Sequence, residues 1–124
     1  MTRRILIVDD EPNIVASIEF LMRGDDYDVR VARNGEEALL LAERFRPDLV
    51  LLDVMMPQRS GFEVCRRIRE NPALSEMKIV MLTARGRDIE RDKGLKSGAN
   101  AYVTKPFSTK ELMNTVRGLL PSSG

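Results

Sequence analysis

With 124 residues, 43% of them hydrophobic and 31% charged, the chain has the length and composition of one ordinary globular domain, which argues against disordered and fibrous classes. Its 20 basic and 19 acidic residues leave a net charge of +1, so we expect no direct binding to nucleic acid or to a membrane surface. No apolar run approaches the roughly 20 residues that span a bilayer and no signal peptide begins the chain, which predicts a cytoplasmic protein.

Five short apolar runs alternate along the chain with segments of helical spacing. We predict strands at these runs, which are Ile5–Val8, Val29–Ala32, Leu49–Leu52, Ile79–Leu82 and Ala101–Val103. Between them, apolar residues recur three and four positions apart, as on one face of a helix. The alternation predicts five helices and a parallel α/β sheet that is covered on both faces, because right-handed crossovers join parallel strands most economically.

Signals for helix ends agree with this division. Pro12 suits the first turn of the first helix, and three capping residues each precede a glutamate by three positions, namely Asn34, Ser60 and Ser108. The fourth helix, expected around 88–97, is the most polar and has only two aliphatic anchors, Ile89 and Leu95.

The strands also differ in character. The first, third and fourth runs are continuously apolar, which is typical of interior strands, whereas polar residues interrupt the second and fifth. A strand order of 2-1-3-4-5 satisfies these constraints and reverses its winding between strands one and three. Ligands bind beyond the carboxyl ends of strands at such a reversal.

Polar side chains follow the strands that should meet there. Asp9, Asp10 and Glu11 come after the first run, Asp53 after the third, Thr83 after the fourth, and Lys105 with Pro106 after the fifth. Carboxylates gathered in a partly dry cleft repel one another unless a cation neutralises them, and Mg²⁺ prefers oxygen ligands. Singly, each residue could be a helix cap or a solvated charge, but together they predict a magnesium site with an ammonium group beside it.

The composition excludes several other chemistries. The chain has no histidine, so it cannot contain a Ser-His-Asp triad or a Cys-His pair, and its single cysteine, Cys65, rules out an internal disulfide. A conventional zinc site is excluded on the same grounds. Any reaction here must use carboxylates, hydroxyls and lysine.

Four segments resemble the receiver domain of two-component response regulators, including chemotaxis regulators: ILIVDDEP, DLVLLDVMMPQRSGFEV, IVMLTA and GANAYVTKPFSTKEL. The likeness extends from Arg4 to Leu120, and we expect a receiver domain over 1–120 with a flexible tail or linker stub at 121–124. It implies a flavodoxin-like, doubly wound sheet with five helices. No output domain follows, so the chain would be either a free-standing regulator or a receiver excised from a larger protein.

The resemblance also implies roles for the strand-end residues. Asp53 would accept the phosphoryl group, Asp10 and Asp53 would bind Mg²⁺ directly, Asp9 would bind it through water, and the backbone carbonyl of Met55 would be a further ligand. Thr83 and Lys105 would each contact a phosphoryl oxygen. Tyr102 would turn inward when Thr83 moves, although packing alone also explains this ring. The Lys105–Pro106 bond would be cis.

These roles describe a phosphoacceptor switch that is not an enzyme in the usual sense, although it would promote its own phosphorylation and slow dephosphorylation. The donor would be a sensor histidine kinase or phosphotransfer protein, and the output would be a change in the face between the fourth and fifth helices that an effector recognises. DNA-binding relatives often dimerise through acidic residues just before the aromatic of strand five. Asn100 and Ala101 stand there, which weakens but does not exclude a phosphorylation-dependent dimer.

Three other classes compete with this interpretation. An aspartate-nucleophile phosphatase would need a second acid near Asp53, which Asp53-Val54-Met55 lacks. A flavin or nucleotide module would need a glycine-rich first loop, but that loop is acidic. A degenerate receiver used only for docking would not need the complete acidic set. The resemblance further implies that Met55 and Arg85 flank the path of hydrolytic water, and our hypothesis is that Met55 shields the acyl phosphate.

Overall fold

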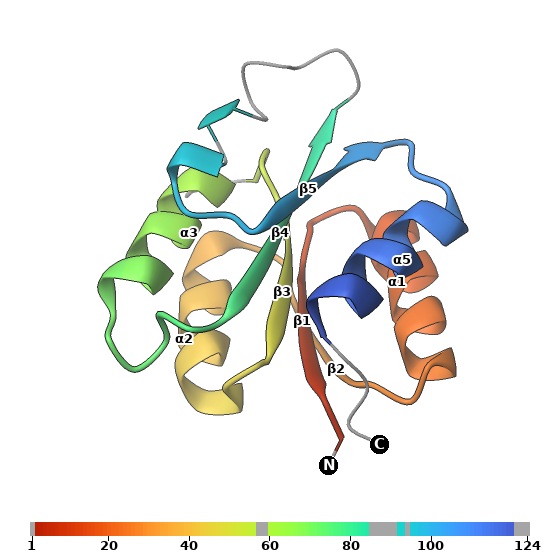
Figure 1. Ribbon diagram of the computed structural model, residues 1–124, viewed down its shortest axis with the longest axis horizontal. Helices are drawn as coiled ribbons and strands as arrows, with labels where there is room; N and C mark the ends of the chain where they lie inside the picture. Colours follow the sequence, from red (N-terminus) through yellow and green to blue (C-terminus); the bar gives the residue numbers. More distant parts are fainter. Residues whose placement is uncertain (1, 57–59, 85–91, 94, 121–124) are drawn as a thin grey trace.

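The computed structural model describes residues 2–56, 60–84, 92–93 and 95–120. One parallel sheet forms the centre, with the order β2-β1-β3-β4-β5 that the strand character predicts (Figure 1). Its strands are β1 (Arg4–Val8), β2 (Asp28–Ala32), β3 (Leu49–Asp53), β4 (Lys78–Ala84) and β5 (Ala101–Lys105). The described helices are α1 (Pro12–Gly24), α2 (Gly35–Phe45), α3 (Gly61–Glu70) and α5 (Thr109–Leu119).

The described residues thus contain four full helices where five were expected. The helix predicted around 88–97 falls largely on 85–91 and 94, which lie outside the described residues. Asp92, Lys93, Leu95 and Lys96 between and after them are helical, and the backbone N–H of Ser97 donates to the carbonyl of Lys93 at 2.9 Å. No helix in the described ranges is long and apolar enough to cross a membrane.

Each predicted cap starts its helix. The Asn34 side chain accepts a hydrogen bond from the backbone N–H of Glu37 at 2.9 Å, and the Ser60 and Ser108 hydroxyls accept equivalent bonds three residues ahead at 3.3 and 3.0 Å. Helix α1 begins at Pro12, whose missing N–H costs nothing in a first turn. These caps fix where the loops that precede three of the helices must end.

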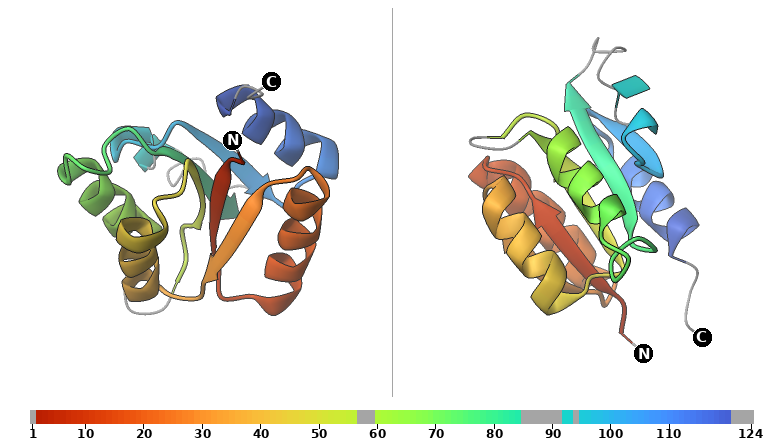
Figure 2. Two further views of the ribbon diagram at one scale, coloured as in Figure 1. Left: turned by 90° about the horizontal axis from the view of Figure 1, so that it is seen from below. Right: turned by 90° about the vertical axis from the view of Figure 1, so that its left-hand side faces the viewer.

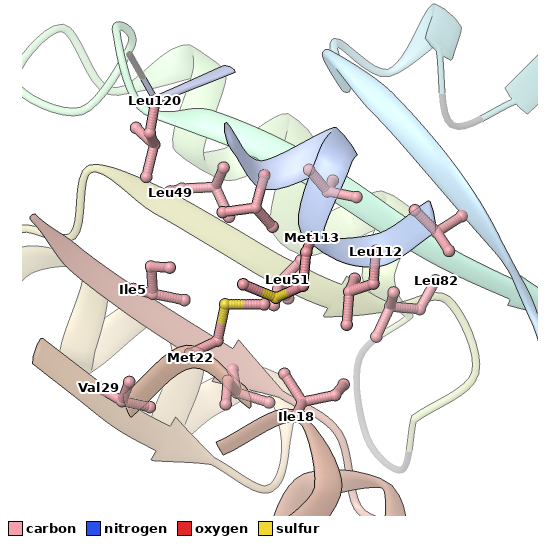
Figure 3. Close-up of a cluster of buried hydrophobic side chains, with 14 of the residues drawn as sticks. Ile5, Ile18, Met22, Val29, Leu49, Leu51, Leu82, Leu112, Met113 and Leu120 are labelled. Atoms are coloured by element: carbon pink, nitrogen blue, oxygen red, sulfur yellow. The ribbon is translucent and has the colours of Figure 1, made fainter. Parts of the chain in front are cut away.

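Two apolar clusters hold the helices against opposite faces of the sheet. Helices α1 and α5 cover one face, and α2 and α3 cover the other (Figure 2). In Figure 3, side chains of α1, such as Met22, and of α5, such as Met113, converge on Leu51 of β3. All five residues of β3 are buried, whereas β2 and β5 alternate with more exposed positions, as expected of edge strands.

A polar brace ties α3 to the start of β5. The guanidinium of Arg69 donates to the carbonyl of Gly98 at 2.8 Å and to the side-chain oxygen of Asn100 at 2.7 Å. The backbone N–H of Ile79 donates to the same Asn100 oxygen at 2.8 Å. Asn100 is therefore part of the link between β4 and β5.

Gly61 gives a sharp test of how closely α3 approaches the loop after β3. A Cβ added there would lie 2.4 Å from the carbonyl oxygen of Asp53 and 2.9 Å from the Cα of Val54, both backbone atoms. We expect Gly61→Ala to lower the free energy of unfolding by roughly 1–3 kcal/mol, because the backbone must shift to make room. Urea unfolding followed by circular dichroism measures this change.

Gly118 provides the matched control on α5, since nothing lies within 4 Å of a Cβ added there. Gly118→Ala should raise the free energy of unfolding by about 0.5–1 kcal/mol, because alanine favours the helix more than glycine does. Equal effects of the two substitutions would contradict the close approach at Gly61.

Candidate functional site

Three carboxylates meet at the carboxyl edge of the sheet. Each of Asp9, Asp10 and Asp53 offers an oxygen, and these oxygens all lie within 4.8 Å of one another. The register brings Asp9 and Asp53 together, because Val8 of β1 pairs with Leu52 of β3 and an aspartate follows each of these two residues. Asp9 is fully buried and Asp53 nearly so, while Asp10 is exposed.

Lys105 reaches this cluster from β5, two strands beyond β3. Its ammonium nitrogen lies 2.9 Å from Oδ2 of Asp9 and 3.5 Å from Oδ2 of Asp53, and only 17% of its side chain is exposed. Side chains alternate between the two faces of a strand. Asp9, Asp53 and Lys105 all continue the rows that pack under α1 and α5, whose last apolar members are Ile7, Leu51 and Val103.

Backbone amides orient the two buried carboxylates. The N–H of Glu11 donates to Oδ1 of Asp9 at 2.9 Å, and the N–H of Met55 donates to Oδ1 of Asp53 at 3.2 Å. Each carboxylate therefore has one oxygen held by the loop that follows its strand and the other turned toward Lys105. The side chains of Asp9 and Asp53 are therefore oriented by the protein itself.

The electrostatics of the site are unbalanced toward negative charge. Burial, reinforced by the charge of Asp9, raises the pKa of Asp53 to about 6, although Lys105 and the Met55 N–H oppose the shift. Burial alone would lower the pKa of Lys105. Its hydrogen bond to Asp9 and the charges of Asp53, Asp9 and Glu11 outweigh that effect, so the pKa of Lys105 lies above its ordinary value. One ammonium group stays charged but does not neutralise the carboxylates around it.

Thr83 and Tyr102 lie together on the other face of the sheet. Thr83 is 3% exposed near the end of β4 and pairs in register with Thr104, two residues beyond Tyr102. Tyr102 pairs with Met81 and packs, partly buried, against the cluster under α2 and α3. The strand alternation gives Thr83 and Tyr102 a common side.

Two further predictions concern Met55 and the Lys105–Pro106 peptide bond. The Met55 side chain is 63% exposed just after Asp53, and the Lys105–Pro106 peptide bond is cis. Arg85 lies outside the described residues. The contact that sequence reasoning missed is between Lys105 and Glu11, whose carboxylate oxygen lies 3.7 Å from the ammonium nitrogen. The only signal for it was the position of Glu11 in the acidic run after the first strand.

The sequence also matches known proteins along nearly its whole length. A family model described as the response regulator receiver domain matches residues 5–117. A solved structure of a candidate response regulator from Chloroflexus aurantiacus J-10-fl is 37% identical with a TM-score of 0.94, and the match covers 98% of this chain and 100% of that one. The chemotaxis response regulator CheY4 of Vibrio cholerae is 30% identical with a TM-score of 0.91, covering 97% and 100%.

A third structure is the receiver domain of a Pseudomonas aeruginosa PAO1 sensor histidine kinase, which has a magnesium ion coordinated in its active site cleft. It is 32% identical with a TM-score of 0.89, and the match covers 98% of this chain and 100% of that one. Since the family match includes all five strands and the acidic edge of the sheet, this chain belongs to the response regulator receiver domain family of two-component signalling.

Proposed function

We propose that this chain is a phosphorylation-dependent signalling switch whose phosphoacceptor is Asp53. The observation that carries the proposal is the setting of this carboxylate: it is buried beside Asp9, oriented by a backbone amide and 3.5 Å from the ammonium of Lys105. Phosphoryl transfer depends mainly on position and on neutralising the equatorial phosphoryl oxygens, which suits a weak but well-placed nucleophile.

Asp9, Asp10 and Asp53 would hold Mg²⁺, together with the backbone carbonyl of Met55. The donor set fits a hard cation, because three carboxylates lie within 4.8 Å of one another and Lys105 alone leaves them with excess negative charge. The bound magnesium in the Pseudomonas aeruginosa receiver supports the same choice here. When bound, Mg²⁺ would neutralise the carboxylates and stabilise negative charge on the phosphoryl oxygens.

The protein's own groups would then carry the transfer. A carboxylate oxygen of Asp53 forms a bond to phosphorus as the phosphorus–nitrogen bond of a partner's phosphohistidine breaks, and the electron pair of that bond stays on the histidine ring. Lys105 pairs with one phosphoryl oxygen and the Thr83 hydroxyl donates to another. The donor histidine must belong to a sensor kinase or phosphotransfer protein, because this chain has none.

The output would follow from the added charge. Phosphorylation brings close to two negative charges to the acidic edge and draws Thr83 toward the new oxygens. Tyr102, on the same face as Thr83, would then turn inward and alter the surface between α5 and the helical residues 92–93 and 95–96. An effector protein would recognise that surface, and a phosphorylation-dependent dimer would use it as well.

Incubation with acetyl phosphate and Mg²⁺ tests the proposal directly. Intact-mass spectrometry should show one added phosphoryl group on the wild type and none on Asp53→Asn, which keeps the shape of the side chain but is not a nucleophile. A chelator should abolish the modification. Modification of the Asp53→Asn variant to the wild-type extent would refute the assignment, and steady phosphate release from varied monoesters would indicate a phosphatase instead.

The raised pKa of Asp53 predicts how stability depends on pH in the absence of metal. Because the folded protein binds this proton more tightly than the unfolded chain does, ionising Asp53 costs stability as the pH rises from about 4 to about 6. Asp53→Asn removes that cost and should be more stable than the wild type near pH 7.5, by at most roughly 3 kcal/mol. The difference should shrink near pH 4.

Urea unfolding in EDTA at both pH values measures this difference. Glu76→Gln is the control, because Glu76 is an exposed acid in the turn before β4. It lies where the strands begin, whereas the site lies where they end. A gain for Asp53→Asn that does not change with pH, or that Glu76→Gln reproduces, would show that ionising Asp53 in the folded protein does not cost stability.

Met55 should control the lifetime of the phosphorylated protein. Its long apolar side chain is exposed beside Asp53 and would shield the acyl phosphate from water. Met55→Asn should therefore lose its phosphoryl group faster than the wild type, whereas Met55→Leu, which stays apolar, should decay at nearly the wild-type rate. Decay is followed by intact mass after the donor is removed, and equal or slower decay of Met55→Asn would count against shielding.

A further inference from the structure

Glu11 is a charged group at the site that the proposed switch does not use. Its carboxylate oxygen lies 3.7 Å from the ammonium nitrogen of Lys105, and its side chain is 61% exposed. By contrast, the side chains of Asp9 and Asp53 are 0% and 7% exposed. Among the described residues, the carboxylates close enough to share one metal ion are the three aspartates and not Glu11.

The local backbone explains why this side chain is available. Glu11 is the N-cap residue of α1, but its side chain makes no capping hydrogen bond, and Pro12 occupies the first helical position. Its backbone N–H is instead bound to Oδ1 of Asp9. The main chain of Glu11 is thus held at the site, while its side chain is exposed to solvent beside Lys105. An exposed ion pair at this distance adds little to stability.

We propose that Glu11 determines which phosphodonors the site accepts, by disfavouring small dianionic ones. This inference rests on the proposed function of Asp53. A phosphoryl group entering the site needs the ammonium of Lys105, for which the Glu11 carboxylate competes. The same carboxylate repels the negative charge of a free donor. A protein donor can offset this repulsion with a basic side chain of its own, which a small molecule lacks.

The reaction that reports on this selectivity is simple to follow. With acetyl phosphate, a carboxylate oxygen of Asp53 bonds to phosphorus as the phosphorus–oxygen bond to the acetyl group breaks, and acetate leaves with the electron pair. With phosphoramidate, the phosphorus–nitrogen bond breaks and ammonia leaves with the protons already on its nitrogen. Near pH 7 acetyl phosphate carries two negative charges and phosphoramidate one, so Glu11 should act more strongly on the former.

The test compares Glu11→Gln with the wild type at saturating Mg²⁺, with phosphorylation followed by intact mass. The variant should react roughly three- to tenfold faster with acetyl phosphate at low salt, because a unit charge a few ångströms from the path of a dianion is removed. The gain should be smaller with phosphoramidate. It should fall to within about twofold in roughly 0.5 M salt, where such charges are screened.

Two variants control for other effects of the substitution. Glu11→Asp keeps the charge and should stay within about twofold of the wild type, since the carboxylate remains near the mouth of the site. Glu76→Gln removes the same charge where the strands begin and should not change the rate. A similar gain in Glu76→Gln would trace the effect to net charge and overturn the inference.

Magnesium affinity gives a readout that does not depend on phosphorylation. Titration calorimetry should show Mg²⁺ binding Glu11→Gln roughly two- to fivefold more weakly than the wild type, because a nearby negative charge has been lost. The thermal unfolding midpoint without metal should not change. Unchanged Mg²⁺ affinity would show that the Glu11 charge does not act on the site and would overturn the inference.

The result of the rate comparison also separates this inference from the function on which it rests. If the wild type is phosphorylated on Asp53 and Glu11→Gln reacts no faster with acetyl phosphate, the role of Glu11 is wrong and the switch stands. If the wild type accepts no phosphoryl group from either donor, both proposals fail.

Discussion

The ammonium group of Lys105 lies between two carboxylates that would otherwise face each other across the carboxyl edge of the sheet. It is 2.9 Å from Asp9 and 3.5 Å from Asp53, in surroundings that leave all three side chains mostly buried. Charges buried in this way are costly unless they are paired and hydrogen-bonded. One cation among several anions satisfies this condition only in part, so burial and the charge of Asp9 raise the pKa of Asp53 despite the opposing effect of Lys105.

The scaffold makes this charge arrangement possible because it holds the strand ends rigidly. Strands β1 and β3 are buried between two apolar clusters, and their register places Asp9 beside Asp53. The close approach of Gly61 to the backbone of Asp53 and Val54 packs the start of α3 directly against the end of β3. At the opposite ends of the strands, Arg69 donates to Gly98 and Asn100 just before β5, the strand that carries Lys105. Packing thus keeps like charges together that would separate in a looser structure.

Excess negative charge with one ammonium is the feature of the site on which the proposed switch depends. It favours a divalent cation, and with that cation it would favour a phosphoryl group on Asp53. The proposed phosphorylation would change the charge of the same edge by about two units. Glu11, outside the buried set but within reach of Lys105, would set how readily free anions enter.

Much of this protein was determined by the sequence itself. The periodicity of apolar residues, the caps at Asn34, Ser60 and Ser108, and the polar interruptions of the outer strands depend on neighbours in the chain, so they predicted the elements and the strand order correctly. The gathering of Asp9, Asp10 and Asp53 followed from that order. The polar fourth helix, by contrast, had too few apolar anchors for its pattern to define it.

Only the tertiary structure decided which charges touch. Lys105 and Asp9 are 96 residues apart. The distances from the ammonium nitrogen to Asp9, Asp53 and Glu11 are 2.9, 3.5 and 3.7 Å, so differences of less than 1 Å decide which carboxylate it contacts most closely. The role of Asn100 as a partner of Arg69 likewise arises where α3 meets the turn before β5. Local patterns carry no information about such contacts, because electrostatic pairing is set by where packing brings distant side chains and not by their spacing along the chain.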